Sequence, residues 1–94
     1  MKFEEFIASL DQHQPPVSLS AELKSLWFDK NDEWEQAHDL AQEIPGSSGS
    51  WIHAYLHRKE GDQWNADYWY RKAGKSSPAS SLDQEWEVLV KAFL

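Results

Sequence analysis

Cysteine is absent from this 94-residue chain, and basic residues are far fewer than acidic ones. The absence of cysteine excludes disulfide bonds, thiolate nucleophiles and sulfur-ligated zinc or iron–sulfur sites. No stretch approaches the roughly 18 consecutive apolar residues of a membrane-spanning helix. The N-terminal MKFEEFIASL has acidic residues within its apolar pattern, which is not typical of a signal peptide. We therefore expect a soluble cytoplasmic protein with no membrane partner.

Charge is unevenly distributed along the chain. The net charge is −7, and residues 1–57 alone carry a balance of −7, whereas residues 58–75 carry +2. A protein that binds nucleic acid needs a basic face that neutralises phosphates, so this charge predicts no nucleic-acid partner. The basic residues within 58–75 could form a local cationic patch, although such clusters are more typical of solvated helix surface.

Helical periodicity recurs throughout the sequence, and strand alternation does not. Phe3, Phe6, Ile7 and Leu10 follow the spacing that places apolar residues on one face of a helix. The hydrophobic residues include six Trp, so large aromatic rings must supply much of the core. At 10.9 kDa the chain has room for one core. These features predict a single all-α domain over residues 1–94.

Turn residues divide the chain into about six helices joined by short loops. Ser18 and Asp32 are candidate N-caps, and Pro45-Gly46 ends a helix. The polar run 47–50 reads as a linker that also caps the next helix. The predicted architecture is a stack of antiparallel helical hairpins, with hairpins at 19–44 and 50–74 and flanking helices at 2–12 and 81–93.

Residues 50–78 carry the pattern of a known repeat. After the Gly61-Asp62 turn, Ala66, Tyr70, Ala73 and Pro78 follow at intervals of four, three and five residues. This spacing resembles a tetratricopeptide repeat, and the run Tyr-Trp-Tyr-Arg-Lys-Ala-Gly resembles the related Sel1-like repeats. The resemblance implies a helical hairpin whose small residues allow close packing, and a protein or peptide partner. The segment is also similar to a small group of functionally uncharacterised short proteins with a His-Ala-Tyr-Leu-His-Arg hairpin, a likeness that implies no activity.

Three histidines are candidate site residues. His53 and His57 stand where the repeat family usually has Leu and an aromatic residue, and His38 lies on the apolar stripe of the preceding helix. A buried histidine must be hydrogen-bonded or face a cavity. The preferred interpretation is that all three are packing residues. A pocket for a small polar or anionic ligand and a metal site are the alternatives, because a His pair four residues apart can reach one metal ion.

A second candidate site is the stripe formed by Trp51, Tyr55 and Arg58 on the helix at 50–60. Aromatic residues with an arginine are favoured at binding surfaces, although these side chains could instead pack against the other helices. No serine or threonine forms a nucleophile motif with the histidines, and HAYLH lacks the glutamate of the HExxH zinc motif. The first choice is therefore a protein without a catalytic residue, a cofactor or a bound metal.

The sequence favours a tetratricopeptide-like interaction module that is not an enzyme and binds a protein or peptide. The predicted binding residues are His38, Trp51, His53, Tyr55, His57 and Arg58. The alternative is a small enzyme or metal-binding protein with a site at the three histidines. Imidazoles that meet in one pocket within about 5 Å support the site, whereas imidazoles that each donate to a backbone carbonyl support packing.

Overall fold

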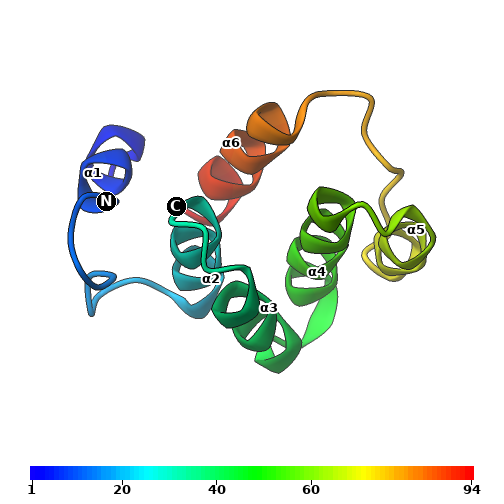
Figure 1. Cartoon of the computed structure of the whole chain (residues 1–94), viewed down its shortest axis with the longest axis horizontal. Helices are drawn as coiled ribbons and strands as arrows, with labels where there is room; N and C mark the ends of the chain where they lie inside the picture. The colour runs from blue at the N-terminus through cyan, green and yellow to red at the C-terminus, as the bar shows by residue number, and fades with distance from the viewer.

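A computed structural model describes residues 1–94 and confirms the all-α prediction, with six helices and no β-strand. Helices α2, α3 and α4 each pack against the next one along the chain, and α6 returns to contact α2 and α4 (Figure 1). No helix combines the length and apolar character needed to cross a bilayer. The helices are α1 (Phe3–Ser9), α2 (Ala21–Lys30), α3 (Trp34–Glu43), α4 (Gly46–Glu60), α5 (Gln63–Lys72) and α6 (Leu82–Phe93).

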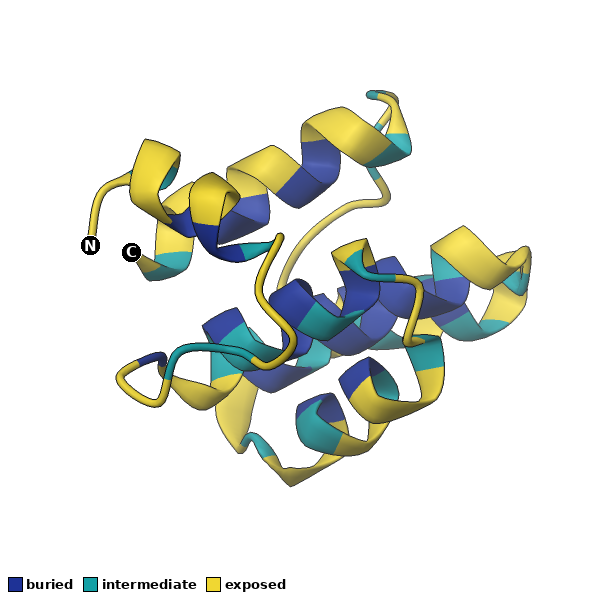
Figure 2. Cartoon of the chain, turned by 60° about the vertical axis from the view of Figure 1, so that its left-hand side comes forward, coloured by how far each residue is buried: buried dark blue, intermediate teal, exposed yellow.

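Helix α4 is the centre of the molecule. It contacts α2, α3, α5 and α6, and every residue from Ile52 to His57 is buried. The buried positions lie where the helices face one another, and exposed positions lie on their outward sides (Figure 2). The core around α4 is formed mainly by side chains of α2, α4 and α6, among them Leu26, Trp27, Ile52, Leu56, Trp86 and Leu89. Polar groups on the buried part of α4 must therefore find partners inside the protein.

The first turn of α4 replaces the linker that the sequence predicts. The helix begins at Gly46, directly after Pro45, so the polar run at 47–50 is helical. Gly49 explains why this turn can form here. A Cβ atom at this position would lie 2.0 Å from the carbonyl oxygen of Ile44, so any larger residue would force the end of α3 away. The connection between α3 and α4 is therefore short and tight.

Other helix boundaries differ by smaller amounts. Helix α2 is capped by Ser20, whose hydroxyl accepts from the Leu23 amide, and not by Ser18. Asp32 does not cap α3, because it takes a left-handed turn conformation with φ of 61°. Gly61 ends α4 in the left-handed conformation, with φ of 90°, at the Gly61-Asp62 turn that the sequence indicates. These local differences leave the order of helices unchanged.

Candidate functional site

The three candidate histidines converge between α3 and α4. Nε2 of His38 lies 2.8 Å from Nε2 of His53, and the ring of His57 stacks on His53 with centroids 4.8 Å apart. One ring nitrogen from each histidine lies within 4.8 Å of the other two. The cluster forms because His53 and His57 are one turn apart on α4, and α3 packs along that side of the helix. The structure thus brings together all three residues that the sequence singled out.

None of the three imidazoles hydrogen-bonds to a backbone carbonyl. Nδ1 of His38 lies 3.1 Å from the side-chain amide of Gln42, and Nδ1 of His57 lies 2.5 Å from a carboxylate oxygen of Glu60. Both contacts occupy Nδ1 and leave Nε2 directed elsewhere. At His57 the Glu60 carboxylate accepts from Nδ1–H, which is the arrangement in which an outer partner sets the tautomer and orientation of a ligating histidine. At His38 the Gln42 amide donates to Nδ1, which places the proton of the neutral ring on Nε2, so His38 would have to change tautomer to ligate through Nε2. Both contacts differ from the backbone bonding expected of packing histidines.

Two tryptophans hold the rings in place. Trp34 of α3 stacks on His38, with ring centroids 4.8 Å apart and planes 12° from parallel. Trp69 of α5 stacks on His53, with centroids 4.0 Å apart and planes 17° from parallel. From the sequence, the tryptophans are expected only as material for the core, and the place of these two in the site is missed. The position of Trp34, four residues before His38 on the same helix, was the one local signal for it.

Burial favours the neutral form of two of the histidines, His38 and His53. Burial is the main cause that lowers the pKa of His53 to about 4, and the neighbouring His38 and His57 lower it further. Burial also lowers the pKa of His38, and so does His57, while nearby carboxylates oppose the shift. A neutral imidazole keeps a nitrogen lone pair available, which is the form that binds a metal ion.

The geometry of the three nitrogens suits a tetrahedral metal ion after small adjustments. Zinc bound at 2.0–2.1 Å holds its ligating nitrogens roughly 3.3 Å apart. The nitrogens of His38 and His53 are closer than this, and no pair of ligating atoms exceeds 4.8 Å. Rotation of the side chains that draws these nitrogens toward a common point would bring all three to bonding distance, with one coordination position left for water or another ligand. The residues present therefore fit such an ion.

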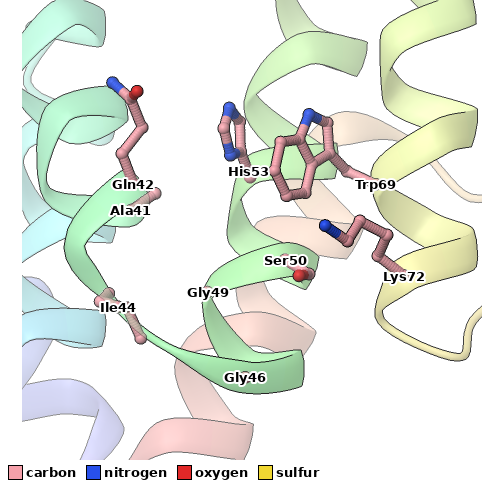
Figure 3. Close-up of a pocket in the computed structure, with 9 residues that line it drawn as sticks. All are labelled: Ala41, Gln42, Ile44, Gly46, Gly49, Ser50, His53, Trp69 and Lys72. Carbon is pink, nitrogen blue, oxygen red and sulfur yellow. The ribbon is translucent and has the colours of Figure 1, made fainter.

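A cavity of about 300 Å³ lies beside His53, between the end of α3, the start of α4 and the side of α5 (Figure 3). The exposed side chains of Gln42 and Lys72 stand at its rim, so the cavity opens to solvent. Its remaining lining combines the small or polar residues Ala41, Gly46, Gly49 and Ser50 with the larger apolar residues Ile44 and Trp69. A small ligand could thus reach the edge of the histidine cluster.

Tyr55 lies inside the fold and not on a binding surface, which corrects the expectation for this residue. It is 2% exposed, and its hydroxyl donates to the Asp29 carboxylate at 2.8 Å. Lys59 pairs with the same carboxylate at 2.9 Å. Burial and the adjacent Asp29 raise the pKa of the Tyr55 hydroxyl, so it remains a donor. This network ties α4 to α2.

Arg58 and Trp51 are also used internally. Arg58 donates to the buried Glu85 carboxylate at 2.8 Å and to the Ser80 carbonyl. Tyr70 donates to the same carboxylate at 2.6 Å. Trp51 is half-buried and packs against the core of the protein. The side chains of Trp51, Tyr55 and Arg58 therefore pack against other helices, as the alternative prediction had it, because α2 and α6 cover that side of α4.

Comparisons with protein-family models, curated proteins and solved structures found no match. The resemblance to tetratricopeptide repeats accordingly stays a prediction. The features that bear on function are those of the site itself: three converging imidazoles, two tryptophans that stack on them, hydrogen-bond partners at His38 and His57, and an adjoining open cavity.

Proposed function

We propose that this chain is a small helical protein that binds a divalent transition-metal ion, zinc above all, through His38, His53 and His57. The observation that carries the proposal is the convergence of one ring nitrogen from each histidine within 4.8 Å. Imidazole suits zinc, copper, iron and nickel, and the chain offers no thiolate. The hydrogen bond from Nδ1–H of His57 to Glu60 favours ligation through the other nitrogen of that ring.

The form of the site favours a reactive or ligand-binding metal over a purely structural one. A structural zinc has four protein ligands, whereas three histidines leave one position open. The core also contains enough buried apolar side chains on α2, α4 and α6 to fold without a metal. We therefore expect the metal-free protein to be helical, and a bound ion to hold a water molecule or an external ligand.

Removing His53 is expected to weaken zinc binding by about 100-fold or more, since losing a ligand costs at least as much as losing an outer partner. Isothermal titration of zinc into protein freed of metal with EDTA measures this for the wild type and His53→Ala. His13→Ala is the matched control, because His13 is exposed and lies outside the cluster. A wild-type protein without micromolar affinity, or equal losses in both variants, would overturn the proposal.

A second function, an interaction module built from tetratricopeptide-like stacked hairpins, is supported by the outer face of α5. Trp64 is 78% exposed there, and Tyr68 is exposed on the same face. Helix α5 packs mainly against α4, so this face has no partner within the chain. Arg71 and Lys72 add positive charge to the same helix. We propose an extended acidic peptide as the partner.

Selection from a library of displayed peptides tests the second function. We expect enriched peptides rich in Asp and Glu whose binding falls about 10-fold or more in Trp64→Ser, since exposed tryptophans dominate binding energy at interfaces. Val88→Ser is the control, because Val88 is an exposed apolar residue on a different helix, α6. Peptides that bind both variants equally, or no enrichment, would argue against an interface on α5.

A further inference from the structure

We propose that the cavity beside His53 binds a small oxyanion, which takes the open position on the metal and pairs with Lys72. The inference rests on the proposed metal site and names the class of ligand that completes it. Four observations support it: the place of the cavity on α4, the position of Lys72, the size and lining of the cavity, and the charge around it.

The cavity continues the line of metal ligands along α4. The residues of α4 that line the cavity recur every three or four positions: Gly46, Gly49 or Ser50, and His53. They therefore share one side of the helix, and His57 follows one turn later on that side. The cavity occupies the earlier turns and the histidine cluster the later ones. A ligand in the cavity therefore approaches the metal ligands from the start of α4, where Figure 3 shows His53 between α3 and Trp69.

Lys72 connects the cavity to the histidine cluster through Trp69. Its ammonium lies 5.0 Å from the centre of the Trp69 ring, and the same ring stacks on His53. The indole face attracts the cation and holds it at the edge of the cavity. Lys72 forms no salt bridge, whereas Lys59 on the neighbouring helix pairs with a buried carboxylate. Lys72 is thus free to pair with an anion.

The size and lining of the cavity favour a small polar ligand. About 300 Å³ is at the lower end of the range for ligand pockets, which suits a small molecule. The Gln42 amide and the Ser50 hydroxyl line the cavity and can bond oxygen atoms of such a ligand.

The charge selects an anion of limited size. A divalent metal ion and Lys72 together attract negative charge at close range, and an oxygen atom is a suitable fourth ligand for zinc. The chain as a whole carries −7, which opposes long polyanions. A carboxylate or a phosphate shares the required chemistry, namely one oxygen on the metal and another near the ammonium.

Cobalt-substituted protein tests the subsite, because the visible spectrum of Co²⁺ reports both its uptake and a change of its fourth ligand. Acetate and inorganic phosphate are titrated separately into Co²⁺-loaded wild type, Lys72→Met and Lys75→Met. We expect a saturable spectral change in the wild type and about 10-fold weaker anion binding in Lys72→Met. Lys75→Met should match the wild type, because Lys75 sits over Trp51, away from this cavity. The anion that binds more tightly assigns the ligand to carboxylates or to phosphates.

The outcomes separate the two proposals. Failure of the wild type to take up Co²⁺ or Zn²⁺ overturns the metal site and the subsite with it. Normal Co²⁺ uptake without a response to either anion overturns the subsite alone. Equal anion affinity in wild type and Lys72→Met also overturns it, because Lys72 is then not a ligand contact.

Discussion

Replacing Glu85 with alanine is expected to lower the free energy of unfolding by about 3–5 kcal/mol. The Glu85 side chain is 4% exposed and accepts hydrogen bonds from Arg58 and Tyr70, so it joins α6 to both α4 and α5. Its removal leaves the guanidinium of Arg58 largely buried and without its counter-charge. A loss of this size is a large part of the stability of a small domain, which is typically 5–15 kcal/mol.

Glu87→Ala is the matched control for this prediction. Glu87 lies on the same helix, pairs with Lys91 at the surface and is about half exposed, so its removal should cost less than about 0.5 kcal/mol. Urea unfolding followed by tryptophan fluorescence measures both variants. Similar stabilities for the two variants would show that the Arg58–Glu85–Tyr70 network does not hold the helices together.

Acidifying the metal-free protein from pH 7 to pH 4 is expected to cost about 3 kcal/mol of stability through His53 alone. The pKa of His53 is about 4 in the folded protein and has its usual value of 6.5 when the chain unfolds. Between these two values the unfolded chain binds more protons than the folded one, so stability falls as pH falls. The contribution of His53 is complete above pH 6.5 and is lost by about pH 4. The lowered pKa of His38 adds to the loss in the same direction.

Urea unfolding in EDTA at several pH values, compared between wild type and His53→Leu, isolates this contribution. The leucine variant cannot titrate at this position, so its stability should depend less steeply on pH between 6.5 and 4. At pH 7 we expect the variant to be as stable as the wild type or more stable, since leucine is the residue that the resembled repeat has here. Parallel pH profiles would show that His53 is not kept neutral by its surroundings, and a large loss at pH 7 would indicate a structural hydrogen bond.

Stability and the candidate site are linked through α4. The pair of Lys59 and Asp29 and the pair of Arg58 and Glu85 fix two sides of this helix, against α2 and α6. The remaining side faces α3 and α5 and carries His53. These two ion pairs, each with a buried carboxylate, therefore set the rotation of α4 that directs its histidines toward His38.

The polar residues of α4 show which contacts sequence patterns can predict and which they cannot. The spacing of His53 and His57 was sufficient to place them on one side of a helix, and the stripe of His38 indicated that the two helices would meet there. The same reasoning left open whether Tyr55 and Arg58 line a binding surface or pack against other helices. Their burial depends on Asp29 and Glu85, which lie 26 and 27 residues away in the chain. No local pattern predicts such pairings.

The start of α4 shows a different limit. The run Gly-Ser-Ser-Gly-Ser has weak helix propensity and is typical of a linker. In the folded protein it forms the first turn of α4, because Gly49 lets the helix approach the end of α3 closely. The tertiary contact outweighs the local preference, and it also builds one wall of the cavity beside His53.

The sequence by itself determined the helical class, the number and order of the helices and the three histidines as the candidate residues. Those features depend on periodicity and turn chemistry, which act over a few residues. The tertiary structure alone decided which polar groups are buried, how the tryptophans enclose the imidazoles and where the cavity opens. These features depend on contacts between residues far apart in the chain, and the free energy of such contacts comes from packing and charge pairing that no short stretch of sequence contains.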